Sequence, residues 1–215
     1  MQAMKLVGYV ADGFNDAGGV FMWVTLFLGM FGFALAAERA FYLYIRCGMN
    51  RHKYMIDLHK ILRTGDMERA VKFSAGFTTP LAKLMTTILA NRDKGEQSLN
   101  KAVDEVFVTE VPKMNRFIPL IAVVANLATL MGLLGTIFGL IMSFDAVANV
   151  PAAQRAQALS SGIQVAMTAT AFGLCVAVCA VFANGMLVSQ AERLSEELDE
   201  KATKMINNLT EEAKA

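Results

Sequence analysis

A long uninterrupted apolar stretch constrains the fold of this chain more than any other feature. Residues 117–144, FIPLIAVVANLATLMGLLGTIFGLIMSF, contain no charged side chain. As a helix rising about 1.5 Å per residue, this stretch would reach about 40 Å, which exceeds the roughly 30 Å hydrocarbon thickness of a bilayer. A buried helix of a soluble protein is rarely apolar over such a length. The sequence therefore predicts a membrane-spanning helix over residues 117–147.

This predicted span also carries a line of small and polar residues. Thr129, Thr136 and Ser143 recur every seven residues, with Gly132 and Gly139 between them, so all five share one helical face. Lipid tails give no reason to place hydroxyls and glycines together, whereas a neighbouring helix or a hydrated pore does. The alternative is that the hydroxyls bond to carbonyls of their own helix and the glycines only permit close packing. As a set, the five residues favour a packed or pore-lining interface over exposure to lipid.

Two further apolar segments complete a prediction of three transmembrane helices. The first span covers residues 18–45, after an N-terminal segment, 1–17, that is expected to lie on the membrane surface as an amphipathic helix. The third span covers residues 162–188 and follows a short loop, 148–161. Its small and polar residues fall on two faces, which predicts protein neighbours on both sides and hence an oligomer: Thr170, Gly173, Ala177 and Asn184 on one face, and Gln164, Thr168, Cys175 and Cys179 on the other.

The remaining segments predict helices outside the membrane, so the expected fold class is an all-α membrane protein with long cytoplasmic helical extensions. Residues 46–116 hold 13 of the 20 basic residues, with a break at Thr64-Gly65-Asp66 and a helix start at Thr79-Pro80. Residues 189–215 continue as a helix with heptad-like apolar positions. Because Lys and Arg concentrate in cytoplasmic segments, we expect a periplasmic N-terminus, a periplasmic loop at 148–161 and a cytoplasmic C-terminus.

Apart from Asp145 at the outer rim of the second span, the second and third spans contain no ionisable side chain of Asp, Glu, Lys, Arg or His. Threonine hydroxyls can order water or coordinate a desolvated ion, but they do not release a proton near neutral pH. If this chain moves protons, the titrating group must come from another polypeptide. Motifs for phosphate-binding loops, nucleophile elbows and His-Cys metal sites are absent, so the sequence predicts neither an enzyme nor a cofactor or metal site. A net charge of +1 with 55% hydrophobic residues points to the lipid bilayer and away from nucleic acid.

The glycine and threonine motifs resemble those of a known family. The second span carries GLLGTIFG at 132–139, followed by Ser143-Phe144. The third span begins with Gly162-Ile163 and continues with TATAFGL at 168–174. Together with Thr64-Gly65-Asp66 and Ala70, these segments resemble the motifs of the MotA/TolQ/ExbB proton-channel family. Three spans with an outside N-terminus are similar to its ExbB/TolQ branch.

The resemblance implies a subunit of an ion-driven motor in the bacterial inner membrane, assembled as a homopentamer whose second and third spans line a central pore. The pore would hold the helices of a dimeric ExbD- or TolR-like partner whose aspartate carries the ion. Ion flow would then energise a TonB- or TolA-like protein that works at the outer membrane. By resemblance, Thr136 and Thr170 match the family's pore threonines and Gln164 and Thr168 lie on a secondary polar face between subunits; the expected ion path also includes Thr129, Gly132, Gly139, Ser143 and Gly173.

Three departures from the family pattern leave the ion open. Val165 stands where many members have a glutamate, Cys179 replaces a proline, and Ala128-Thr129-Leu130 replaces an Ala-Pro before the glycines. Loss of the glutamate and gain of hydroxyls at Thr129 and Thr168 make Na⁺ an alternative to the expected H⁺. A gliding or flagellar-type stator is an alternative within the family. A passive membrane scaffold without ion flux is the alternative from another class.

Overall fold

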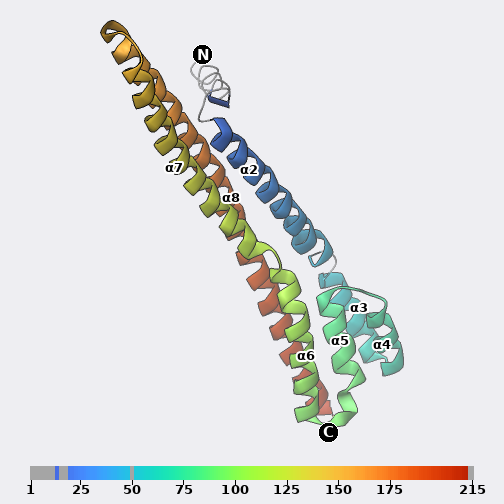
Figure 1. Cartoon of the computed structure of the whole chain (residues 1–215). Coiled ribbons are helices and arrows are strands. Elements are labelled where there is room, and N and C mark those ends of the chain that lie inside the picture. The colour runs from blue at the N-terminus through green and yellow to red at the C-terminus, as the bar shows by residue number, and fades with distance from the viewer. Residues whose placement is uncertain (1–12, 15–18, 49–50, 213–215) are drawn as a thin grey trace. The chain divides into compact units, whose positions relative to one another are not determined.

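A computed structural model describes residues 13–14, 19–48 and 51–212, and its regular structure there is entirely helical (Figure 1). The all-α prediction is confirmed. The amphipathic helix predicted for residues 1–17 lies largely outside the described residues. The elements in order are α2 (Gly19–Ala40), a π-helical turn (Phe41–Arg46), α3 (Arg51–Arg63), α4 (Met67–Ala75), α5 (Pro80–Ala90), a 3₁₀ turn (Arg92–Lys94), α6 (Glu96–Asn115), α7 (Ile118–Ala148), a 3₁₀ turn (Ala152–Gln154) and α8 (Arg155–Glu212).

Three helical stretches, which contain α2, α7 and α8, are long and apolar enough to cross a membrane. The connection between the second and third of them is shorter than the loop predicted for residues 148–161. Helix α7 runs to Ala148 and α8 begins at Arg155, so the second half of the predicted loop is helical. The third span and the C-terminal tail form one helix of 58 residues.

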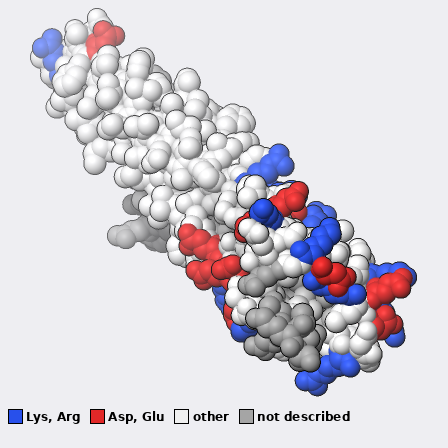
Figure 2. Space-filling model, turned by 90° about the horizontal axis from the view of Figure 1, so that it is seen from below, with Lys and Arg blue, Asp and Glu red and all other residues white. Residues whose placement is uncertain are grey.

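The chain divides into two compact units. The membrane unit comprises residues 1–37 and 117–186, and the charged unit comprises residues 38–116 and 187–215. Among the described residues of the membrane unit, Asp145 and Arg155 are the only charged ones, and Figure 2 shows the charged side chains gathered over the other unit. Many large apolar side chains of the membrane unit are exposed, as lipid contact requires: Val20, Phe27, Phe33, Leu130, Ile141, Val178 and Phe182 are examples.

Within the membrane unit, α2 contacts α7 and α8 through its own glycines. A β-carbon added at Gly32 would lie 2.8 Å from Val124 Cγ1 on α7, and one added at Gly29 would lie 3.1 Å from Val176 Cγ1 on α8. Closer to the start of α2, the Phe21 ring lies 5.0 Å from a ring on α7. Small residues let the helices approach closely, as is typical of helix packing in membranes.

In the charged unit, local sequence signals define the start of α4 and α5. The Asp66 carboxylate accepts a hydrogen bond from the Arg69 amide at 3.0 Å, and Thr79 Oγ1 accepts one from the Ala82 amide at 3.3 Å. These are N-caps, and Pro80 occupies the first turn of α5, where no amide donor is needed. Gly65 has a φ of +76°, a conformation that favours glycine. The predicted break and helix start are both confirmed.

The core of the charged unit is built around α5 and the second part of α8. Helices α3 and α4 contact each other, α4 contacts α5, and α5 contacts α6. Tyr54 on α3 donates a hydrogen bond to Ser74 on α4 at 2.8 Å, and both side chains are buried. The heptad-like apolar positions predicted for the tail are largely buried, namely Leu187, Ala191, Leu194, Leu198 and Met205.

The buried carboxylate of Glu110 links α6 to α5 through two lysines. Glu110 on α6 accepts hydrogen bonds at Oε1 from Lys113 Nζ at 2.7 Å and from Lys83 Nζ at 2.9 Å, and its side chain is only 6% exposed. Burial by itself opposes ionisation of Glu110, but the hydrogen bonds and positive charges of Lys113 and Lys83 outweigh it. The pKa of Glu110 is therefore lowered.

Helix α6 ends at a sharp backbone change before α7. Phe117 has a φ of +65°, an uncommon conformation for a residue with a side chain, and it separates the two helices. Pro119 lies in the first turn of α7, where proline is well tolerated. Near the end of α6, the Arg39 guanidinium donates a hydrogen bond to the Lys113 carbonyl at 3.1 Å.

Candidate functional site

Helices α7 and α8 pack against each other along a seam of small residues. The α7 side is buried, and the α8 side is buried except for the half-buried Gly162. On both helices the small residues recur at spacings of four and three. Because the two helices run in opposite directions, each small residue of α7 faces one of α8. The seam consists of Ala128, Gly132, Gly135, Gly139 and Ser143 on α7 and of Gly162, Ala166, Ala169, Gly173 and Ala177 on α8.

The approach of the two helices leaves no room for larger side chains. A β-carbon at Gly139 would lie 2.9 Å from the β-carbon of Ala166, and one at Gly135 would lie 2.9 Å from that of Ala169. A β-carbon at Gly173 would lie 2.7 Å from a backbone carbonyl oxygen of α7. Because close-packed backbones have little freedom to move, these positions need glycine for the observed distance between α7 and α8.

This close approach brings two hydroxyls together at the edge of the seam. Thr136 Oγ1 on α7 lies 3.1 Å from Thr170 Oγ1 on α8. Thr170 Oγ1 also donates to the Gly132 carbonyl of α7 at 2.8 Å, which is a hydrogen bond between the two helices. Thr136 Oγ1 lies 2.6 Å from the Leu133 carbonyl of its own helix. Both threonines are half-buried, so this threonine pair retains some surface outside the seam.

The threonine pair has fewer protons than acceptors. Two hydroxyl protons serve three contacts, and once Thr170 donates to Gly132, the Thr136 proton goes either to Leu133 or to Thr170. Each hydroxyl therefore keeps lone pairs that can accept a hydrogen bond from water or coordinate a cation. Neither hydroxyl loses a proton near neutral pH, so the pair provides polar oxygens but no titrating group.

The structure divides the five-residue face predicted on the second span. Gly132, Gly139 and Ser143 are buried in the seam and face α8 of the same chain, with Ser143 Oγ donating to the Gly139 carbonyl at 2.6 Å. Gly173 lies opposite Gly132 in the same seam. Within one protomer these four residues pack two helices together, and their place beside a pore stays a prediction about the assembly.

The other predicted residues lie outside the seam. Thr129 is exposed on α7, with its hydroxyl bonded to the Ala125 carbonyl of its own helix at 3.1 Å. On α8, Gln164 is exposed, and Thr168 Oγ1 donates to the Gln164 carbonyl at 2.8 Å. These residues are available to neighbouring subunits or to lipid. Their assignment to an ion path or to a face between subunits stays a prediction.

Sequence reasoning missed that Ala128, Ala166 and Ala169 take part in the seam. The signal was present, because α7 and α8 repeat small residues with the same spacing. Alanine is common in any helix, however, so the shared spacing becomes informative only when the sequence of α8 is read in reverse beside that of α7. Across the described residues, no group of three or more His, Cys, Asp or Glu side chains is placed to hold a metal ion.

This geometry defines an all-α membrane protein with three spanning helices, two of which meet at a small-residue seam bordered by a hydroxyl pair. The model of the MotA/TolQ/ExbB proton channel family matches residues 74–200, which is more than half of the chain and includes α7 and the first part of α8. The chain therefore belongs to the MotA/TolQ/ExbB proton channel family, and the resemblance stated from its motifs is confirmed.

Individual relatives agree with this assignment. The chain is 25% identical over 176 residues to a protein from Methanothermobacter thermautotrophicus named as a biopolymer transport protein ExbB homolog, covering 81% of this chain and 61% of that protein. It is 28% identical over 170 residues to an ExbB-like biopolymer transport protein of Synechocystis, covering 78% of this chain and 80% of that protein. It is 30% identical over 145 residues to the Tol-Pal system protein TolQ of Pseudomonas aeruginosa, covering 65% of this chain and 62% of that protein. The chain thus spans less than two thirds of the length of the Methanothermobacter and Pseudomonas proteins.

Proposed function

We propose that this chain is the pore-forming subunit of an ion-driven motor of the ExbB/TolQ type in the bacterial inner membrane. In this proposal it assembles as a homopentamer, and its α7 and α8 helices surround the membrane helices of a dimeric ExbD- or TolR-like partner. Ion flow through the complex drives a TonB- or TolA-like protein. The chain itself carries out no enzymatic reaction and holds no cofactor.

The observation that carries the proposal is the Thr136–Thr170 pair, a polar contact between two helices whose apolar parts carry no charged side chain. Among the described residues, no Asp, Glu, Lys, Arg or His lies in α7 before Asp145 or in α8 between Arg155 and Glu192. A polar contact in such surroundings supports water or an ion, while the absence of an internal acid requires that the proton carrier come from elsewhere. A partner helix bearing a carboxylate supplies that group.

The orientation follows from the distribution of basic residues. Arg155 is the single basic residue between α7 and the apolar part of α8, whereas the charged unit holds most of the Lys and Arg. The positive-inside rule then assigns the charged unit to the cytoplasm and the α7–α8 connection to the periplasm. This arrangement leaves the N-terminus in the periplasm and the C-terminus in the cytoplasm.

Copurification followed by a flux measurement tests the proposal. The tagged chain is purified from its native membranes, and a copurifying protein with a single span and an intramembrane carboxylate is expected. The complex is then reconstituted into liposomes, and ion flux is compared for Thr136→Val, Thr170→Val and a control, Thr25→Val. Thr25 is suited to this control because, among the described residues, its buried hydroxyl bonds only to the Phe21 carbonyl of α2, at 2.8 Å.

The expected result is intact assembly in all variants, with flux reduced at least about tenfold in the Thr136 and Thr170 variants only. Intact assembly without ion flux in the wild-type complex would instead support a passive scaffold. Imposing a proton gradient at constant sodium, and then a sodium gradient at constant pH, identifies the ion. Flux that follows sodium alone would replace H⁺ by Na⁺ and would fit coordination by hydroxyl oxygens.

A further inference from the structure

A recess on the charged unit gathers cationic side chains from two helices. Its volume is about 650 Å³, and it lies between the beginning of α3 and the part of α8 that follows Glu197. Arg51 and Lys53 line it from α3, and Lys201 and Lys204 line it from α8. Four permanent positive charges therefore face one concave surface, although these helices are far apart in sequence.

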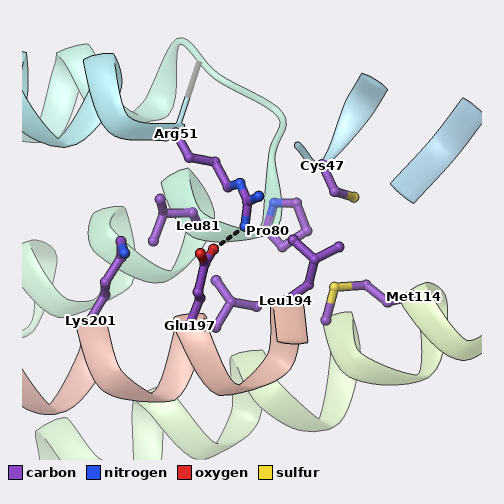
Figure 3. A pocket seen from close by; sticks show the side chains of 9 residues that line it. Cys47, Arg51, Pro80, Leu81, Met114, Leu194, Glu197 and Lys201 are labelled. Atoms are coloured by element: carbon purple, nitrogen blue, oxygen red, sulfur yellow. Dashed lines mark hydrogen bonds and ion pairs between the residues drawn. The ribbon is translucent and has the colours of Figure 1, made fainter. Parts of the chain in front are cut away.

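Two of these charges are already neutralised. Glu197 forms an ion pair with Arg51, which Figure 3 shows beside Lys201, and Glu200 forms one with Lys204. The hydrogen bond from Lys204 and the nearby positive charges hold the pKa of Glu200 below its usual range, so the Glu200 carboxylate is ionised at neutral pH.

Lys53 and Lys201 account for the remaining charge. Within the part of the chain that the structure describes, neither lysine has an ion-pair or hydrogen-bond partner. The lining of the recess thus carries an excess of two positive charges. Like charges on a shared concave surface repel each other, and a bound anion removes that repulsion.

The size and lining of the recess define the class of anion. A phosphate group with two ionised oxygens carries close to two negative charges near neutral pH, which matches the excess. Lysine is a compact charge suited to phosphate, and an arginine can share its donors between a carboxylate and a phosphate. The described lining contains no Phe, Tyr or Trp, so it provides charge without a stacking surface for a nucleobase.

We propose that this recess binds a phosphate-bearing anion through Lys53 and Lys201, with Arg51 beside them. The phosphate belongs either to a soluble compound or to a phospholipid whose headgroup is a terminal phosphate, and both sources present a phosphate with two ionisable oxygens to the two lysines. Binding at this site ties the start of α3 to the tail of α8. It is independent of the ion path through the membrane unit, so it can hold or fail without affecting the proposed motor function.

Two binding measurements on the complete chain, purified in neutral detergent with any partner that copurifies, test this inference. The soluble arm measures binding of inorganic pyrophosphate by equilibrium dialysis. The lipid arm uses nanodiscs of phosphatidylcholine with phosphatidic acid, whose headgroup is a terminal phosphate, and counts the phosphatidic acid that remains bound by native mass spectrometry. Lys53→Gln combined with Lys201→Gln removes the excess charge. Lys60→Gln combined with Lys72→Gln is the matched control, because these exposed lysines lie outside the recess and its lining.

Saturable pyrophosphate binding that weakens about tenfold in the recess variant, and less than about twofold in the control, identifies a soluble ligand. Retention of phosphatidic acid by the wild type and the control, but not by the recess variant, identifies a lipid source and equally supports the site. The inference is overturned if neither probe binds the wild type, or if the recess and control variants lose binding to the same extent.

Discussion

Gly162 on α8 lies so close to Ser143 on α7 that a β-carbon on the glycine would overlap Ser143 Oγ and lie 2.5 Å from Ser143 Cβ. No real side chain tolerates that distance, so α7 and α8 can approach this closely at Ser143 only because residue 162 is a glycine. The register established at this point continues along both helices to the threonine pair. Close packing at one end of the seam therefore controls the distance between two hydroxyls further along it.

Gly162→Ala should destabilise the protein by about 2 kcal/mol, because the added methyl forces α7 and α8 apart. Thermal unfolding of the purified chain in detergent measures the change. Gly185→Ala is the control, since a β-carbon at Gly185 would have no described residue within 4 Å beyond its chain neighbours and the nearby backbone of its own helix. It should be neutral or stabilise the helix by about 0.5–1 kcal/mol. An unchanged unfolding midpoint for Gly162→Ala would contradict the close approach.

Thr170→Val should lower stability by about 1 kcal/mol, because it removes the hydrogen bond to the Gly132 carbonyl. Thr170→Ser keeps the hydroxyl and should keep both stability and ion flux. Thr136→Val should cost less stability, since its proton is divided between Leu133 and Thr170. Unfolding of the two single valine variants and the double variant gives the coupling between the hydroxyls. A coupling near zero would mean that the two threonines act separately.

Stability of the charged unit should fall in acid because of Glu110. Its pKa in the folded protein is below the ordinary value of 4.5, so the folded state binds fewer protons than the unfolded chain in this range. The stabilisation is complete above pH 4.5 and is lost as the pH falls through the lowered pKa. Glu110→Gln should flatten this dependence when unfolding is followed from neutral to acidic pH. If the glutamine variant keeps the wild-type acid slope, other carboxylates are responsible.

The Tyr54–Ser74 contact should contribute to the packing of α3 on α4. Tyr54→Phe leaves the fully buried Ser74 hydroxyl without its partner and should cost about 1–2 kcal/mol. Adding Ser74→Ala to that variant should recover part of the loss, because no unpaired hydroxyl then remains. Chemical denaturation of the single and double variants measures both effects. Strict additivity would show that the hydrogen bond does not contribute.

Single cysteines test the orientation. In a background with Cys47, Cys175 and Cys179 replaced by serine, Arg155→Cys should react with a membrane-impermeant maleimide added to cells whose outer membrane has been opened. Lys94→Cys should react only after the inner membrane is also disrupted, since Lys94 is an exposed residue of the charged unit. The reverse labelling pattern would invert the topology proposed from the basic residues.

Much of this fold was predictable from local sequence. The number of spans follows from apolar length, and the starts of α4 and α5 follow from Asp66 and from Thr79-Pro80, whose side chains act within a single turn. The α7–α8 connection was predicted too long, because residues such as Gln157 and Ser161 have no strong preference and the helix extended through them. The motif residues Thr136 and Thr170 were also identified from sequence, but their contact at 3.1 Å was not.

By itself, the sequence determined the composition of the spans, the helix boundaries marked by caps, and the absence of an acid from the second and third spans apart from Asp145 at the rim. These properties depend on neighbours along the chain and on transfer from water to lipid. Only the tertiary structure decided which small residues pack against each other. Heptad spacing put Thr129, Thr136 and Ser143 on one face, but burial against α8 separated them into an exposed, a half-buried and a buried position. That division depends on the rotation and register of two helices, and each helix alone carries no information about its partner.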